Sequence, residues 1–246
     1  MKVAVVIATY WRRDDSTVKH LHKMFLNLCA QTHTQFKVFI VGDHYAKEQE
    51  LFDVVKQYSN RLDIYCKNNP TSLRKGYFTI RANLWTCGGI LARYAALKQA
   101  IREDYDVYLH LDDDDIWLPN HIKNYVNVFR QFPLVDFVFS KAQYKQTYLP
   151  HNVPAGLAIG MNNLKGAVRP ANIVHSSFGF NLKTCGGLLD TLFTNRIATI
   201  NQIKNKRIKE TRLEPFDAVQ LKALQPRKCI CIPQITCRKL SDVNIP

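Results

Sequence analysis

The sequence predicts an α/β fold with a mostly parallel central sheet, and two features support this prediction. In the first half of the chain, apolar runs rich in β-branched residues alternate with segments of helical spacing, an order typical of parallel βαβ units. In the middle of the chain, four consecutive aspartates directly follow one of these runs. Parallel sheets bind ligands beyond the carboxyl ends of their strands, so we expect the functional site around these aspartates.

The elements expected in the first half come in strict alternation. Continuous apolar runs are typical of strands buried on both faces. Apolar residues that recur every three or four positions indicate helices packed against such a sheet. The order is strand 3–8, helix 16–30, strand 36–41, helix 47–58, strand 62–66, helix 88–102 and strand 106–111.

The second half is less regular and predicts a mixed sheet. Pro119 suits the first turn of a helix, because no amide hydrogen is needed there. Further on, we expect strands at 137–148, 173–182 and 229–237, and helices at 184–194 and 216–224. No linker-like segment separates the two halves, so we expect one continuous domain.

The composition is that of a globular protein with a basic surface. The 246 residues, 46% of them apolar, suffice for a sizeable core, and the formal net charge is +14. There is no bilayer-spanning run, no signal-peptide pattern and no Cys-x-x-Cys pair among the seven cysteines. We expect a cytoplasmic protein with reduced cysteines, whose positive charge attracts anions, a peripheral anionic membrane surface included. Nucleic acid is not expected, because no aromatic–basic module or zinc finger accompanies the charge.

The acidic run Asp112 to Asp115 predicts a metal site. Neighbouring carboxylates repel one another unless a cation compensates their charge, and a divalent metal ion with oxygen ligands does so and then bridges to a diphosphate. In an extended segment the first and third side chains share one side, so Asp112 and Asp114 form the expected metal pair. A solvated acidic turn without metal is the alternative, and Asp115 is an alternative cap for the helix near Pro119.

An ordered set of segments resembles the inverting family 2 glycosyltransferases with the GT-A fold. The Leu-Asp-Asp-Asp-Asp-Ile-Trp-Leu-Pro run is the most specific of them, and the opening strand through Thr-Tyr-Trp-Arg is another. Tyr94 stands where the family has an asparagine, and Pro215-Phe216 splits the family's Glu-Asp motif. The segments follow the family's order at 5–12, 38–43, 92–94, 111–119, 174–187 and 214–217.

The resemblance implies one GT-A domain with two halves. Residues 1–118 would form a single Rossmann-like half that binds the nucleotide sugar, with a mostly parallel central sheet. Residues 119–246 would form a mixed-sheet half that binds the acceptor, with a turn at Gly186-Gly187 shaping the acceptor side.

The resemblance also implies donor and metal roles for particular residues. Thr9, Tyr10 and Arg12 would line the nucleoside pocket, and Asp43 would accept a hydrogen bond from the base. Arg93 would bind the diphosphate. Simpler structural roles stay open, namely edge packing for Tyr10, a helix cap for Asp43 and a surface ion pair for Arg93.

The acidic run and the C-terminal half complete the implied site. Asp112 and Asp114 would hold Mn²⁺ or Mg²⁺ next to the donor, with Asp113 in the donor-binding set. Inversion needs a base that deprotonates the acceptor hydroxyl. Asp217 is the first candidate for this base and Glu214 the second, with helix capping as the alternative role for both. The residues expected on the acceptor side are His175, Ser176 and Trp117.

The implied function is metal-dependent, inverting transfer of a sugar from a nucleotide sugar, with UDP-sugars favoured, to a hydroxyl of a glycan or glycoconjugate. One alternative is a non-catalytic glycan-binding module with a degenerate transferase fold. A second is a metal-dependent sugar-phosphate phosphatase of the haloacid dehalogenase type, which also places Asp-x-Asp after a buried strand. In those phosphatases, however, the pair follows the first strand, whereas here it lies mid-chain.

Overall fold

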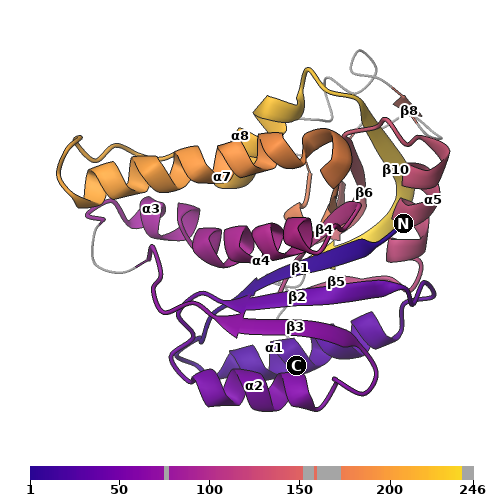
Figure 1. Ribbon diagram of the computed structural model, residues 1–246, viewed down its shortest axis with the longest axis horizontal. Helices are drawn as coiled ribbons and strands as arrows, with labels where there is room; N and C mark the ends of the chain where they lie inside the picture. The colour runs from indigo at the N-terminus through magenta and orange to yellow at the C-terminus, as the bar shows by residue number, and fades with distance from the viewer. Residues whose placement is uncertain (75–77, 152–157, 160–172, 240–246) are drawn as a thin grey trace.

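The computed structural model describes residues 1–74, 78–151, 158–159 and 173–239. One sheet runs through the molecule, and helices cover both of its faces (Figure 1). The strands are β1 (Val3–Thr9), β2 (Phe36–Gly42), β3 (Asp63–Asn68), β4 (Val107–Asp112), β5 (Asp115–Trp117), β6 (Phe137–Tyr144), β7 (Thr147–Leu149), β8 (Ala158–Ile159), β9 (Phe178–Asn181) and β10 (Cys229–Lys239). The helices are α1 (Ser16–Cys29), α2 (Glu48–Lys56), α3 (Arg81–Thr86), α4 (Ile90–Arg102), α5 (His121–Gln131), the short 3-10 helix η1 (His175–Ser177), α7 (Leu182–Lys204) and α8 (Phe216–Leu224).

The sheet has the strand order β3-β2-β1-β4-β9-β6-β10-β5, with β7 paired to β6 and β8 to β10. Strands β3, β2, β1 and β4 all run parallel. Strand β9 is antiparallel to both β4 and β6, whereas β10 runs parallel to β6. The predicted α/β class is therefore confirmed, with a regular parallel part followed by a mixed part.

The alternation of side chains along β1 divides the core into two layers. Val3, Val5 and Ile7 pack with residues of α1, α2 and α5, while Ala4 and Val6 pack with residues of α4 and α7. All five side chains are fully buried. A strand buried on both faces leaves only its ends for polar side chains. The carboxyl ends of β1, β2 and β4 meet at one edge of the sheet, and this edge carries the site.

Two strands expected in the second half are shorter than the sequence predicted. The segment 137–148 is a hairpin of β6 and β7, because Lys145 turns the chain in the left-handed conformation (φ 56°). The segment 173–182 is η1 followed by β9. Both corrections arise from turns inside runs whose apolar pattern alone reads as a strand.

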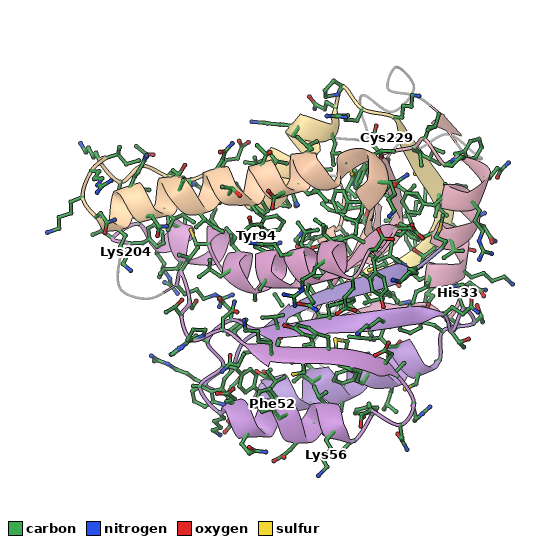
Figure 2. The ribbon with its side chains drawn as sticks, in the orientation of Figure 1. His33, Phe52, Lys56, Tyr94, Lys204 and Cys229 are labelled. Carbon is green, nitrogen blue, oxygen red and sulfur yellow. The ribbon has the colours of Figure 1, made fainter. Side chains whose placement is uncertain are left out.

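Helix α7 is longer than the predicted 184–194. Asn181 caps its start by accepting a hydrogen bond from the amide of Lys183, and the buried side chains of Ile200 and Ile203 continue its apolar face. The predicted turn at Gly186-Gly187 is wrong, because both glycines lie within this helix. Lys204 marks the far end of α7 (Figure 2).

The chain after the acidic run also differs from the expectation. Asp115 begins β5, which pairs antiparallel with β10, so Asp115 does not cap a helix. Helix α5 begins at His121 with Asn120 at its N-cap, and Pro119 lies before the first turn. Pairing with β10 keeps residues 115–117 extended. No local sequence pattern indicates this contact, because β10 lies more than a hundred residues further along the chain.

A polar clasp joins the start of α3 to the segment before α8. The Glu210 carboxylate accepts hydrogen bonds from the amides of Thr79 (2.8 Å) and Ile80 (3.0 Å), which satisfies donors that a helix start leaves free. The fully buried Asn83 donates to Glu210 (2.9 Å) and accepts from the amide of Leu213 (2.8 Å). These bonds span about half the chain in sequence and fix the two segments to each other.

None of the helices in the described ranges is long and apolar enough to cross a membrane. All seven cysteine thiols are free. Burial raises the pKa of Cys185 and of Cys229 to about 12, so these thiols stay protonated at neutral pH.

Candidate active site

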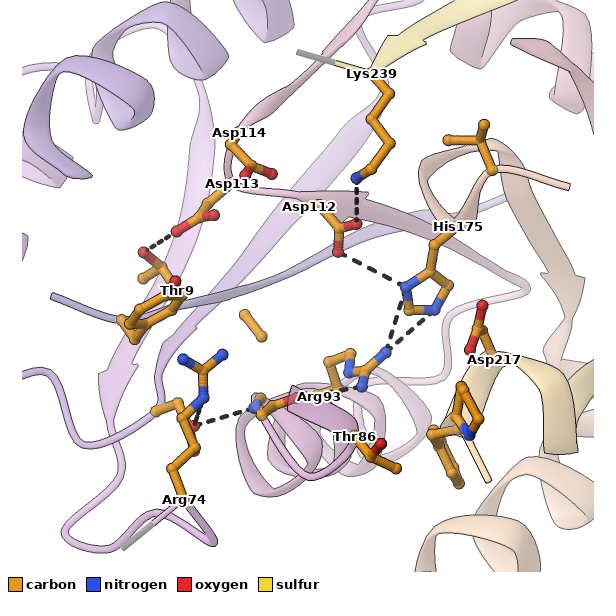
Figure 3. A pocket seen from close by; sticks show the side chains of 18 of the residues that line it. Thr9, Arg74, Thr86, Arg93, Asp112, Asp113, Asp114, His175, Asp217 and Lys239 are labelled. Carbon is orange, nitrogen blue, oxygen red and sulfur yellow. Dashed lines mark hydrogen bonds and ion pairs between the residues drawn. The ribbon is translucent and has the colours of Figure 1, made fainter. Parts of the chain in front are cut away.

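A cavity of about 660 Å³ lies at the carboxyl ends of β1, β2 and β4 (Figure 3). It brings together most of the residues expected from the sequence. Ser176, Trp117 and Glu214 do not line it. The expected residues that do line it are Thr9, Tyr10, Arg12, Asp43, Arg93, Asp112, Asp113, Asp114, His175 and Asp217.

Asp43, at the end of β2, has one carboxylate oxygen engaged and one without a partner. Its Oδ2 accepts hydrogen bonds from the Ser72 hydroxyl (2.8 Å) and the Gly89 amide (3.0 Å). Its Oδ1 is buried and has no hydrogen-bond partner within the described part of the chain. Asp43 does not cap α2, whose N-cap is Lys47. An unsatisfied buried acceptor is costly, so this oxygen is well suited to a ligand N–H.

The Tyr10 ring lies between two guanidinium groups. The Arg12 guanidinium carbon is 4.6 Å from the ring centroid, and that of Arg74 is 3.8 Å from it. The Arg74 guanidinium also lies 3.7 Å from Asp43 Oδ2 and packs against Gly88, where a Cβ would have no room. Arg74 was not expected from the sequence, because it comes from an irregular loop without a motif.

Asp113 ties the ends of β1 and β4 together. It is buried and accepts a hydrogen bond from the Thr9 hydroxyl (2.6 Å). Arg12 donates to both of its carboxylate oxygens, at 2.7 and 3.0 Å. Burial by itself would lower the pKa of Arg12, but the Asp113 carboxylate raises it above its usual value. Such a bidentate pair fixes Arg12 in the cavity wall.

Asp112 is held through one of its two carboxylate oxygens. Oδ1 lies 2.9 Å from His110 Nε2 and 3.7 Å from His175 Nδ1, whereas Oδ2 faces Lys239 Nζ at 3.8 Å. Burial alone would raise the pKa of Asp112. The hydrogen bond from His110 and the positive charge of Lys239 instead hold the pKa of Asp112 below its usual range, so Asp112 is ionised at neutral pH.

The histidine rings at 110 and 175 are stacked, with centroids 3.8 Å apart. Burial lowers the pKa of both, and so both are neutral at pH 7. Arg93 Nη1 lies 3.1 Å from His175 Nε2. The same Arg93 nitrogen lies 3.4 Å from His175 Nδ1, so Arg93 contacts this ring at both nitrogens. Both histidine rings lie next to Asp112 Oδ1, at 2.9 and 3.7 Å, and help to position this carboxylate.

The remaining aspartates of the run are crowded by like charges. Burial, with Asp112 and Asp113 nearby, raises the pKa of Asp114. Burial first, and then the neighbouring aspartates, raise the pKa of Asp115 to about 7, although Lys239 lies 3.6 Å away. A cation bound between these carboxylates would relieve their mutual repulsion.

The donor set fits a divalent metal ion. Ligand atoms of His110, Asp112 and His175 lie within 4.8 Å of one another, and the cavity wall adds Asp114. Carboxylate oxygens suit Mg²⁺ and Mn²⁺, and Mn²⁺ also accepts imidazole nitrogen. The hydrogen bond between His110 Nε2 and Asp112 Oδ1 suits an arrangement in which the carboxylate binds the metal and the histidine supports the carboxylate from behind.

Asp217 enters the cavity from the first turn of α8, on the side that carries His175 (Figure 3). Pro215 is the N-cap of this helix, so Asp217 does not occupy the cap position. Glu214 lies outside the cavity and forms an ion pair with Lys222 at 2.5 Å. Only Asp217 of the two base candidates therefore faces the cavity.

Two of the residues expected on the acceptor side are buried behind the acidic run. The Trp117 indole N–H donates to the Ser176 carbonyl at 2.6 Å, and both residues are inaccessible to solvent. Tyr94 stands where the glycosyltransferase family has an asparagine. Its ring stacks on Phe193 between α4 and α7, and its hydroxyl donates a hydrogen bond to Asp190 (2.9 Å; Figure 2). This tyrosine therefore links two helices outside the cavity.

Comparison with known proteins gives a consistent result for the fold. The chain is 28% identical over 259 residues to an uncharacterized glycosyltransferase of Acanthamoeba polyphaga mimivirus, covering all of this chain and 96% of the relative. No family model matches. Among solved structures, S. aureus TarS 1–349 superposes with a TM-score of 0.65 at 17% identity, covering 97% of this chain. That structure has also been determined with UDP and with UDP-GlcNAc.

A mannosyltransferase of Pyrobaculum calidifontis, in complex with GDP-Man and Mn²⁺, superposes with a TM-score of 0.54 at 13% identity. The chain spans about 60% of the length of the TarS 1–349 structure and 58% of the mannosyltransferase. The likeness to these structures concerns the fold, whereas the similarity to the viral relative extends along the whole sequence. Together they show that this chain has the GT-A fold and is similar along its whole length to a protein described as a glycosyltransferase.

Proposed function

We propose that the protein transfers a sugar from a nucleotide-sugar donor, with UDP-sugars favoured, to a hydroxyl of a glycan or glycoconjugate, with inversion and with a divalent metal ion. The observation that carries the proposal is the presence, in one cavity, of Asp43 with one oxygen still available and of Asp112, Asp113 and Asp114 from the acidic run. Residues 1–118 supply the donor side and residues 119–246 the acceptor side.

Asp43 favours a uracil base over guanine. Only one of its oxygens is available, because the other already accepts from Ser72 and Gly89. Uracil presents a single N–H on its pairing edge, between two carbonyls, which matches one available acceptor. Guanine presents two adjacent donors and would need both oxygens. Thr9 and Tyr10 close the same end of the cavity and would enclose the nucleoside.

Asp112 and Asp114 would hold Mn²⁺ or Mg²⁺ through their oxygens. When bound, the metal supplies Lewis-acid neutralisation of the charge that develops on the leaving nucleotide. Around it, Arg93 and Lys239 place two cations on the cavity wall where the diphosphate would lie. Asp113 acts through Arg12, whose guanidinium it fixes next to Tyr10.

Asp217 would act as the base. Inversion requires a carboxylate on the face of the sugar opposite the leaving group. Asp217 lies across the cavity from Thr9 and Arg74 (Figure 3). Its carboxylate would accept the proton of the acceptor hydroxyl as that oxygen attacks the anomeric carbon. Glu214 is the second candidate.

The basic segment after α7 supports peripheral contact with an anionic membrane from a cytoplasmic location. Ile208 is 42% exposed within this segment. An exposed apolar side chain among cations suits a charged bilayer surface. The cations around it are exposed and comprise Lys204, Lys206, Arg207, Lys209 and Arg212.

The decisive experiment is a calorimetric titration of the protein with UDP-, GDP- and CDP-sugars, with and without Mn²⁺, followed by an assay of donor hydrolysis. We expect metal-dependent binding and turnover of a UDP-sugar. Asp112→Ala and Asp114→Ala should each abolish metal-dependent binding and turnover. Intact activity in both variants would contradict the proposal. Binding without any hydrolysis or transfer would favour the non-catalytic glycan-binding module.

A further inference from the structure

Two adjacent serines in η1 have different partners. Ser176 and Ser177 are both completely buried. The Ser176 hydroxyl accepts a hydrogen bond from the Asp112 amide (2.9 Å) and donates to Asp115 Oδ2 (2.6 Å). The Ser177 hydroxyl donates to the Val174 carbonyl (2.6 Å), within its own turn. Only the first of these hydroxyls contacts the acidic run.

Ser176 contacts both ends of the acidic run. A hydroxyl has one proton, so donation to Asp115 leaves its lone pairs for the Asp112 amide, and the direction of both bonds is fixed. The Ser176 carbonyl accepts from the Trp117 indole at 2.6 Å, which adds a third contact just beyond the run. Hydrogen bonds shielded from water in this way are stronger than exposed ones.

The contact with Asp115 also reaches the cavity. Asp115 is buried, and its Oδ2 lies 3.6 Å from Lys239 Nζ. Lys239 in turn faces Asp112 Oδ2 at 3.8 Å. Ser176 therefore orients the carboxylate that helps to hold Lys239, as well as the backbone of Asp112 itself.

We propose that Ser176 is a positioning residue for the metal-binding carboxylates, which rests on the proposed function. By fixing the residues at both ends of the run, it restricts the two between them, and Asp114 is one of these. Carboxylates that are held in place before the metal arrives bind it with less ordering cost. Ser176 was expected on the acceptor side. Its contacts instead place it behind the acidic run, outside the cavity.

The test compares Ser176→Ala with Ser177→Ala, two changes that each remove one oxygen from an equally buried position of the same turn. Mn²⁺ binding is measured by electron paramagnetic resonance in the presence of UDP, and folding by urea unfolding. We expect Ser176→Ala to weaken Mn²⁺ affinity by about 10- to 100-fold, as loss of an outer-shell partner does. Ser177→Ala should keep the wild-type affinity.

Equal Mn²⁺ affinities of the two variants, whether both fall or neither does, would overturn the positioning role. If Ser176→Ala does not fold, Ser176→Cys replaces it, because sulfur is only a weak donor and acceptor and should give a smaller loss of Mn²⁺ affinity. A Ser176→Cys protein with wild-type affinity also contradicts the inference. Failure of the wild type to bind Mn²⁺ with UDP would count against the proposed function instead, so the two failures are distinguishable.

Discussion

The two ends of the cavity hold their aspartates in different ways. At the nucleoside end, Asp43 Oδ2 accepts hydrogen bonds from two neutral donors and faces the Arg74 guanidinium at 3.7 Å, while the buried Oδ1 has no partner among the described residues. At the reaction end, the Asp112 carboxylate is contacted by two histidines and a lysine. The first arrangement suits recognition of a ligand by its hydrogen-bond pattern. The second stabilises the negative charge of the Asp112 carboxylate.

From this contrast we expect substitutions at the two ends to impair different properties of the protein. Loss of a hydrogen-bonding atom at the nucleoside end changes which donor binds. Loss of a charge at the reaction end changes metal binding and the rate at which the donor reacts, without changing which base is preferred. A variant whose defect falls in the wrong category would contradict this division of the cavity.

The largest effect is expected from Asp217→Asn. An amide cannot take the proton of the acceptor hydroxyl, so transfer should slow by about 100- to 10,000-fold. Binding of UDP and Mn²⁺ should be unchanged, because Asp217 lies across the cavity from Thr9 and Arg74 (Figure 3). Steady-state transfer assays and titration calorimetry measure the two quantities. If Glu214→Gln gave the large loss and Asp217→Asn did not, the base would be reassigned to Glu214.

The next largest effect is expected from Asp114→Asn. Removal of this metal-binding charge should lower kcat by about 100- to 1,000-fold. The same substitution should raise the Mn²⁺ concentration that is needed for half-maximal activity. Titration of transfer activity with Mn²⁺ tests this, with Asp53→Asn on the exposed face of α2 as the control. An unchanged Mn²⁺ requirement in Asp114→Asn would remove this residue from the metal site.

A smaller but more specific effect is expected from Asp43→Asn. The Gly89 amide requires an acceptor at the Oδ2 position, so the new NH₂ group should replace Oδ1. It would then meet the N–H of uracil donor to donor, and UDP affinity should fall by about 10- to 100-fold. Cytosine presents a ring nitrogen acceptor there, so the ratio of CDP to UDP affinity should rise. A uniform loss for both nucleotides in calorimetry would argue against base readout by Asp43.

The smallest effect is expected at the Glu210 clasp, whose Glu210 and Asn83 do not line the cavity. The hydrogen bond from the Thr79 hydroxyl, with further backbone donors, lowers the pKa of Glu210 to about 2. Its ionised form thus stabilises the fold above the unfolded pKa of about 4.3. This contribution is lost as the pH falls from there towards 2. In Glu210→Gln, the urea midpoint of unfolding should decrease less steeply with falling pH in this range than in the wild type. The same pH dependence of the midpoint in both proteins would contradict the role of Glu210.

The residues at the strand ends of the cavity were largely predictable from the sequence. Thr9, Asp43 and Asp112 each follow or end a buried apolar run, and the carboxyl ends of parallel strands meet at one edge. Sequence pattern therefore suffices to bring these three residues together. The paired arrangement of Asp113 with Arg12 also follows from strand ends, because β1 and β4 are neighbours.

The other residues that contact these strand ends were much less predictable. His110 is an inward-facing residue of a buried strand, and nothing local distinguishes it from a core histidine. Ser176 depends on a short 3-10 turn inside a run that reads as a strand, and its partners are 61 and 64 residues away. Arg74 reaches Tyr10 from a loop without periodicity. Such contacts are decided by tertiary packing rather than by local pattern.

The clasp between Asn83, Glu210 and Leu213 has a practical consequence for protein engineering. It couples the loop that carries Arg74 to the segment that leads into Asp217, although more than a hundred residues separate them. A graft that replaces only one of these segments with that of a relative would leave the buried Asn83 or the Glu210 carboxylate without partners. Chimeras designed to change donor or acceptor preference should therefore exchange residues 69–89 and 205–217 as one unit.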